Sequence, residues 1–450
     1  MRVAVTWNES SVLMRQPTRR MPVMTRGEGV WLFDAEGKKY FDASSGALVV
    51  SVGHGNRFVA DAIHAQLLKA GYVNGTQFTS DVTEDAAAKL AKLAREELPD
   101  VGALRAAFLC SGSEAVEAAV KFARQVQVER GHKERVKVIA RAPSYHGNTF
   151  YALSLSARPA YRVAYGPMLA TIPTVMAPTA FKLSPTPTRE ALAKELEAVI
   201  AREGANTIAA FIAEPVMGSS GGAAVPPAGH FDDVRRICDA NGILFIADEV
   251  MCGAGRTGNF FACKTVNAAP DVIVMGKGLG GGAAPVSAVL VRESLMDEVR
   301  AGSGYFAHAQ TYLQAPFLTG AANAVLDFFE KEQLVAHVQD VGAAFQKKLR
   351  ERLSKVPYVG AIQGTGLIAG VELVDGDKPF PRAAKVAERL VAHLFERGVV
   401  VWPNVGHANG TDGDLFMLGP PLVMTHAEAD TLVDSLGRAL ETFNPQGTTK

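Results

Sequence analysis

The stretch VIVMGKGLGGG, residues 272–282, sets one lysine among glycines directly after an apolar run. The run VIVM predicts a short buried strand, and Lys277 follows it at the carboxyl end. Glycines on both sides let the backbone and a flat ring approach each other closely. A lysine in such a place can hold a phosphate or attack a carbonyl carbon, and the surrounding sequence has to decide between the two.

Two nucleotide-binding interpretations of this stretch fail. A phosphate-binding loop of the GxxxxGK type needs serine or threonine after its lysine, but Gly278 follows Lys277, and VIVM stands where a glycine loop is required. A dinucleotide fingerprint needs a helix that opens from the glycines and an acidic partner for the ribose, and neither is evident. The remaining interpretation is an amine that attacks a carbonyl carbon.

Short apolar runs on either side of this stretch alternate with helical patterns. Runs such as VKVIA, TIAAFIA and GILFIA end at polar residues, and segments such as AVEAAVKFARQVQ between them have apolar residues at helical spacing. This alternation predicts an α/β fold, with a mostly parallel sheet that has helices on both faces.

The order of strand-like and helix-like patterns along the chain predicts three regions. Residues 1–65 form an N-terminal segment with a strand hairpin around AEGK, and residues 66–330 form the large domain. Residues 331–450 form a smaller α+β domain, which the N-terminal segment joins. We also expect one long helical tract over residues 320–355.

Five predicted strands end in polar groups. Because ligands of parallel α/β sheets collect at the carboxyl ends of the strands, we expect these groups to meet. They are CSGSE (110–114), SYHGN (144–148), Glu214, Asp248 with Glu249, and Lys277.

Each strand end also has an ordinary structural explanation. Ser111 and Glu114 have capping-box spacing, so the segment after them is a helix N-terminus whose free N–H groups suit a phosphate or serve only the cap. Tyr145 is a ring for stacking or a loop aromatic, and Asp248 is a functional carboxylate or one half of a structural ion pair. Taken together, the amine, the phosphate seat, the ring and the carboxylate fit pyridoxal phosphate.

The amino-acid composition limits the classes of molecule that the protein is expected to bind. The 46 basic residues balance 46 acidic ones, which argues against nucleic acid or an anionic membrane as the partner. The four cysteines show no pairing or metal-ligand spacing, so we expect neither disulfides nor a metal site. The chain begins without an apolar signal core and has no membrane-length apolar stretch, so we expect a cytoplasmic protein.

The motifs together resemble the class III, or omega, aminotransferases, which are pyridoxal phosphate enzymes of fold type I. The resemblance runs over almost the whole chain, through SGSEAVEAAVKFAR, SYHG, AEPV, ADEVMCGAGRTG, MGKGLGGG and QTYLQAP. It implies a large domain with a mostly parallel sheet of the seven-stranded type and a smaller α+β domain built from both termini. The subgroup it resembles most is that of the omega-amino acid and amine:pyruvate transaminases.

The resemblance also implies roles for individual residues. Lys277 would form the Schiff base and move the proton, and Asp248 would pair with the pyridine nitrogen. Tyr145 and Val250 would pack against the two faces of the ring. The other implied cofactor-binding residues are Ser111, Gly112, Ser113, His146, Glu214 and, from the neighbouring subunit of a homodimer or tetramer, Thr311.

Departures from the family pattern concern the substrate. Met417 stands where many relatives have an arginine for a carboxylate, and Leu48 stands where amine:pyruvate relatives tend to have tryptophan. These two residues predict an apolar pocket for a donor whose charged group lies far from the reacting carbon. Arg162 is a candidate for holding the acceptor's carboxylate, with a surface arginine as the alternative.

The sequence thus predicts a transaminase that moves an amino group from an omega-amino acid or primary amine to a keto acid such as pyruvate, in two half-reactions. The resemblance leaves two other reactions open, those of an aminomutase and of a decarboxylating aminotransferase. A third hypothesis is a binding or scaffolding protein that keeps this fold without enzymatic activity. The presence of both Lys277 and Asp248 argues against it.

Overall fold

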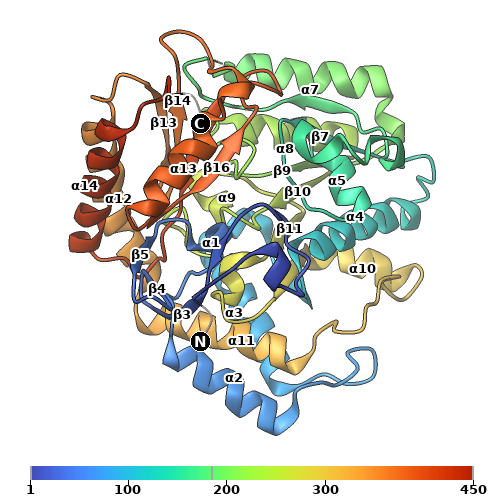
Figure 1. Ribbon diagram of the computed structural model, residues 1–450. Coiled ribbons are helices and arrows are strands. Elements are labelled where there is room, and N and C mark those ends of the chain that lie inside the picture. The colour runs from blue at the N-terminus through green and yellow to red at the C-terminus, as the bar shows by residue number, and fades with distance from the viewer. Residues whose placement is uncertain (1–2, 184–185, 448–450) are drawn as a thin grey trace.

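The computed structural model describes residues 3–183 and 186–447 and is built around a seven-stranded sheet (Figure 1). The strand order is β6-β12-β11-β10-β9-β7-β8. All neighbours are parallel except β12, which is antiparallel to both β11 and β6, so the expected mostly parallel sheet is confirmed. The strands are β6 (Leu104–Leu109), β7 (Lys137–Ala142), β8 (Thr174–Met176), β9 (Ile208–Ala213), β10 (Leu244–Asp248), β11 (Val272–Met275) and β12 (Ser287–Arg292).

Helices cover both faces of this sheet. Side chains of β10 alternate between the two layers: Leu244 and Ile246 pack in one apolar cluster, and Phe245 and Ala247 in the other. This alternation follows from the period of two in a strand, and a sheet buried on both faces needs the continuous apolar runs seen in the sequence. The first cluster includes α4 (Gly112–Glu129), α5 (Phe150–Leu155) and α10 (Glu293–Ala301), and the second includes α3 (Asp81–Glu97), α7 (Arg189–Glu203) and α8 (His230–Asn241).

Both ends of the chain contribute to two further sheets. The hairpin expected around AEGK is present, and strand β15 from the C-terminal region pairs in parallel with its second strand. The first sheet has the order β15-β5-β4-β3 and the second β13-β14-β17-β16. Their strands are β3 (Met24–Glu28), β4 (Trp31–Asp34), β5 (Lys39–Asp42), β13 (Val359–Thr365), β14 (Ile368–Leu373), β15 (Val399–Val400), β16 (Trp402–Val405) and β17 (Asp414–Leu418), and a separate pair is β1 (Ala4–Val5) with β2 (Met21–Pro22). The division at residues 65 and 330 stays a prediction, and its outermost residues, 1–2 and 448–450, lie outside the described chain.

The long helical tract expected over residues 320–355 is present, but it is not one continuous helix. The structure has two helices there, and Gln333 between them takes a left-handed backbone conformation with φ of 46°. The first packs on α2 and α3, whereas the second packs on α14 and β13, so the chain has to change direction. The remaining helices are α1 (Ser45–Leu48), α2 (Arg57–Ala70), α6 (Pro159–Arg162), α9 (Ala262–Thr265), α11 (Pro316–Lys331), α12 (Leu334–Leu353), α13 (Val386–Glu396) and α14 (His426–Thr442).

Strand β12 was not predicted, and it explains the glycine stretch. The chain leaves β11, passes through a short 3-10 helix (Lys277–Gly280) and reverses direction into β12. Gly281 and Gly282 have φ of 64° and 84°, which only glycine adopts without strain. Lys277 therefore lies in a tight reversal at the carboxyl edge of the sheet. Among the described residues, no helix is both long and apolar enough to cross a membrane.

Candidate active site

A cavity of about 160 Å³ lies at the carboxyl ends of the parallel strands. It brings together all five strand ends that the sequence singled out, because residues after β6, β7, β9, β10 and β11 reach it. Its lining consists of Gly112, Ser113, Tyr145, His146, Gly147, Glu214, Ser219, Asp248, Val250, Met251, Cys252 and Lys277.

Lys277 is half-buried in this cavity with a strained backbone. Its φ of 42° is left-handed, which costs a non-glycine residue on the order of 1 kcal/mol. Burial lowers the pKa of its amine, and the nearby Asp248 and Glu214 partly oppose that shift. Within residues 3–183 and 186–447, no hydrogen bond uses its Nζ. A larger fraction of the amine is thus neutral than for an exposed lysine, which is the state that attacks a carbonyl.

Asp248 is held by two contacts at the end of β10. Its Oδ2 lies 2.7 Å from Nδ1 of His146, and its Oδ1 accepts a hydrogen bond of 3.0 Å from the backbone N–H of Val250. Asp248 and His146 are each only 3% exposed. The other ring nitrogen of His146, Nε2, is buried and has no partner in the described chain. The carboxylate is therefore fixed in orientation at the cavity wall.

The N-terminus of α4 contributes an anion-binding position to the lining. Ser111 caps the helix by accepting the N–H of Glu114 at 3.3 Å, but the Glu114 carboxylate accepts the N–H of Cys110 at 3.1 Å rather than that of Ser111, so the expected capping box is only half formed. The backbone N–H groups of Gly112 and Ser113 make no hydrogen bond within the described residues. Free N–H groups at a helix N-terminus suit a phosphate.

The close approach of Val250 makes glycine necessary at position 112. A Cβ atom on Gly112 would lie 2.7 Å from Cγ1 of Val250, closer than real Cβ atoms approach. We expect Gly112→Ala to shift the helix start or Val250 and to weaken binding of pyridoxal phosphate by about tenfold or more, from an overpacking cost of ~1–3 kcal/mol. A spectroscopic titration of apoprotein with the cofactor measures this. Gly166→Ala, where a Cβ meets nothing within 4 Å, is the matched control, and equal affinities in both variants would contradict the expectation.

Glu214 lines the cavity beside a buried arginine. Its Oε1 accepts the N–H of Gly218 at 2.8 Å, whereas Oε2 is buried without a partner in the described chain. Burial raises the pKa of the Glu214 carboxyl, and His146 and Arg141 oppose the rise. Arg141, which is 1% exposed, donates a hydrogen bond to the backbone carbonyl of Glu214. The sequence analysis missed Arg141, although a lone arginine in the apolar run of β7 was the available signal.

The buried side chain of His230 makes the stability of the folded protein depend on pH. Both of its ring nitrogens are buried without partners in the described chain, and burial together with Arg141 lowers its pKa from 6.5 to about 4. Because the unfolded chain binds this proton more tightly, stability falls as the pH drops from 6.5 toward 4, by about 3 kcal/mol at most. Chemical unfolding at pH 7 and pH 5 should show a smaller loss for His230→Phe than for the wild type. Equal losses would show that His230 is not the titrating group.

The predicted pocket residues Leu48 and Met417 do not line the cavity. Both are almost fully buried and pack in one apolar cluster that contacts Met251, which does line it. Met417 belongs to β17, and the other members of the cluster are Phe181, Ala223, Ile368, Leu415 and Trp402. The two residues thus support an apolar wall through Met251 rather than forming its surface.

Arg162 is not placed to hold a carboxylate in this cavity. Its Nη1 donates to the backbone carbonyls of Leu153, Ser154 and Ser156, at 3.2, 2.7 and 3.0 Å. These carbonyls lie at the C-terminal end of α5, where the helix leaves acceptors unpaired. Arg162 therefore caps a helix. Thr311, expected to act in the neighbouring subunit, is exposed and does not line the cavity of its own chain.

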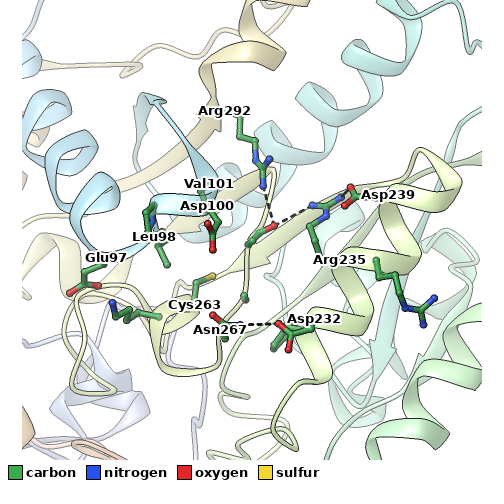
Figure 2. Close-up of a pocket in the computed structure, with 16 residues that line it drawn as sticks. Glu97, Leu98, Asp100, Val101, Asp232, Arg235, Asp239, Cys263, Asn267 and Arg292 are labelled. Atoms are coloured by element: carbon green, nitrogen blue, oxygen red, sulfur yellow. Dashed lines mark hydrogen bonds and ion pairs between the residues drawn. The ribbon is translucent and has the colours of Figure 1, made fainter.

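A larger cavity, of about 670 Å³, lies at the opposite, amino edge of the strands (Figure 2). Its arginines are already compensated: Arg235 lies 2.8 Å from Asp271 and Arg292 lies 3.5 Å from the same carboxylate. It contains none of the residues that the sequence predicted for the site. Lys277 and Asp248, at the ends of neighbouring strands, line only the smaller of these two cavities.

The fold and the lysine cavity together define a pyridoxal phosphate enzyme of fold type I. The model of the family described as "Aminotransferase class-III" matches residues 14–440, so the chain belongs to this family of aminotransferases. A gamma aminobutyrate transaminase 3 from Solanum lycopersicum is 34% identical over 93% of this chain and 80% of the relative.

Two solved structures show the same architecture. An (S)-enantioselective omega-transaminase from Thermomicrobium roseum has a TM-score of 0.86 at 35% identity, covering 96% of this chain and 95% of that one. An amine transaminase from an uncultivated Pseudomonas species, solved with pyridoxal phosphate bound, also has a TM-score of 0.86, at 32% identity, covering 96% of this chain and 97% of that one.

The cofactor of this chain is pyridoxal phosphate, and the cavity residues suit it. Free N–H groups at the start of α4 match the phosphate, and an amine of lowered pKa matches the aldehyde. Tyr145 supplies a ring in the lining, and Asp248 supplies a fixed carboxylate. When bound, the cofactor draws electrons away from the substrate carbon that loses its proton.

Proposed function

We propose that this aminotransferase moves an amino group from an omega-amino acid or a primary amine to a keto acid such as pyruvate, by two successive half-reactions. The names of the relatives support this proposal, since an omega-transaminase, an amine transaminase and a gamma aminobutyrate transaminase are all similar to the chain. The observation that carries it is the lining of the cavity: none of its residues is an arginine, and its outer wall rests on the apolar cluster of Met417 and Leu48.

The physical argument concerns where the substrate can carry charge. A carboxylate on the reacting carbon would enter a cavity whose described lining has no cation except Lys277, which is needed for chemistry. An apolar group at that position is stabilised by burial, at about 25 cal/mol per Å². The site therefore favours donors whose amino carbon bears no carboxylate, and the carboxylate of a keto acid acceptor has to be held by a group outside this lining.

The residues of the chain divide the work in this proposal. Lys277 removes the proton from the substrate carbon and returns it at the neighbouring position, as a base and then as an acid. Asp248, oriented by His146, holds the proton of the pyridine nitrogen. Tyr145 and Val250 enclose the ring, while Ser111, Gly112 and Ser113 form the phosphate seat, with Glu214 near the ring hydroxyl.

We further propose a homodimer in which Thr311 reaches the partner's site. Thr311 lies beside an apolar surface that includes Tyr72 and Tyr312, whose rings pack edge to face at 5.6 Å although both residues are about half exposed. Leu68, Phe78 and Tyr305 are 77%, 65% and 65% exposed in the single chain. Large exposed apolar side chains of this kind are typical of a protein interface.

The first experiment follows the absorbance of the purified holoenzyme without an acceptor. Pentylamine, which has no carboxylate, should convert the yellow cofactor band to that of the aminated cofactor, and pyruvate should then restore it. Conversion with alanine but not with pentylamine would refute the proposal. Release of carbon dioxide, or an isomerised donor as the only product, would instead indicate a decarboxylating enzyme or an aminomutase.

A further inference from the structure

Arg158 is a buried cation without an anionic partner. The residue is 7% exposed, and none of the ion pairs within residues 3–183 and 186–447 includes it. Its Nη2 donates a hydrogen bond of 2.7 Å to Oδ1 of Asn404, which is neutral, and its Nε is buried with no acceptor in the described chain. A buried charge that lacks a counter-charge costs free energy, so this guanidinium is suited to receive an anion.

Arg158 is linked to the lysine cavity by two routes. Its Cζ lies 4.5 Å from the ring centre of Tyr161, and Tyr161 packs edge to face on Tyr145, with ring centres 5.8 Å apart. On the other side, the amide nitrogen of Asn404 donates to the backbone carbonyl of Ser219. Tyr145 and Ser219 both line the cavity. The guanidinium is thus one side chain away from the lining in each direction.

The surroundings of Arg158 strengthen its positive field. Arg15 lies over the same tyrosine ring, with its Cζ 5.8 Å from the ring centre. Burial lowers the pKa of Arg158, and Arg15 adds to that effect, but an arginine keeps its charge in proteins. Arg162, by contrast, already donates to three carbonyls. Of the arginines on α6 and its N-cap, Arg158 alone has buried donor capacity left over in the described chain.

We propose that Arg158 binds the distal carboxylate of an omega-amino acid donor, with Asn404 and Tyr161 orienting its guanidinium. This inference rests on the proposed function and names the substrate class more closely. The amino carbon has to lie at Lys277, inside a cavity without arginine, so a carboxylate on that carbon does not reach Arg158. A carboxylate several bonds away from the amino carbon extends beyond the lining to Arg158. Arg158 then takes the role of the arginine that many relatives have at the position of Met417.

The test compares 5-aminopentanoate with pentylamine, which differ only in the carboxylate. We expect Arg158→Gln to lower the ratio of kcat/KM for 5-aminopentanoate over pentylamine by about 30-fold or more, mainly through KM, because the carboxylate loses a buried charged partner. Arg158→Lys should restore part of the ratio. Arg162→Gln is the matched control, since loss of a helix cap should affect both substrates alike. A loss of equal size for both substrates in Arg158→Gln would overturn the proposal.

A binding measurement tests the inference without turnover. Calorimetric titration of the holoenzyme with pentanoate, which has no amino group, should show binding to the wild type and at least tenfold weaker binding to Arg158→Gln. Asn404→Asp places a carboxylate 2.7 Å from Arg158 with almost no change in the shape of the side chain. Because this carboxylate competes for the guanidinium, the variant should weaken the binding of pentanoate to a similar extent. Unchanged pentanoate binding in either variant would overturn the proposal. If the wild type converts neither amine, the proposed function fails, while this titration still decides the role of Arg158.

Discussion

Lys277→Ala should abolish turnover and lower kcat by roughly 10⁴-fold or more, because one side chain supplies both the nucleophile and the base. The amine has a lowered pKa, no hydrogen-bond partner in the described chain and a position at the cavity wall, so no neighbouring group duplicates it. Single-turnover assays with pentylamine, followed at the cofactor band, measure the loss. The same spectra show whether the cofactor still binds without a covalent link.

Two further variants make the lysine result specific. Lys277→Arg keeps a cation in the cavity but not a nucleophilic amine, so it should be as inactive as the alanine variant. Lys133 is exposed and does not line the cavity, so Lys133→Ala should keep wild-type rates. Substantial turnover in Lys277→Ala or Lys277→Arg would mean that another group carries the proton, and the assignment of Lys277 would have to be abandoned.

Asp248→Asn should slow proton removal from the substrate on the order of 10²-fold or more, since an amide cannot balance the charge of a protonated pyridine nitrogen. The substitution keeps the size of the side chain, so the contacts with His146 and Val250 can be retained and the loss is electrostatic. The rate of the first half-reaction, measured by stopped flow, reports the step directly. Cofactor affinity should change far less than this rate.

Glu249 provides the matched control for Asp248. It is the adjacent carboxylate, yet it points elsewhere: its oxygens accept the backbone N–H groups of Ala262 and Cys263 at 2.7 Å each, and burial raises its pKa to about 7. Glu249→Gln should therefore affect stability more than the half-reaction rate. If Glu249→Gln and Asp248→Asn slow the half-reaction equally, position 248 has no special role.

Much of the fold was readable from local patterns. The apolar runs ending at Glu214, Asp248 and Lys277 are strands of the large sheet, and the residues at their ends meet in one cavity. Such predictions succeed because a strand buried on both faces needs an unbroken apolar run, and parallel strands present their carboxyl ends at one edge. The helix at 112–129 was equally visible, because its cap and its apolar period are local in sequence.

Other parts of the fold escaped local reasoning. The helix break at Gln333 was missed because the apolar period continues across it, and only the different partners of α11 and α12 require a change of direction. Strand β12, from the run SAVLVR, was also not predicted. Its antiparallel place between β11 and β6 depends on the reversal at Gly281 and Gly282.

The sequence by itself determined the class of the protein, its cofactor and most of the residues that meet in the lysine cavity, since each is encoded in short motifs at strand ends. The tertiary structure decided which cations remain free. Sequence reasoning singled out Arg162 and not Arg158, but Arg162 lies within reach of three carbonyls at the end of α5, whereas Arg158 meets Asn404, which is 246 residues away. Whether a buried charge finds a counter-charge depends on such distant contacts, which no local pattern contains.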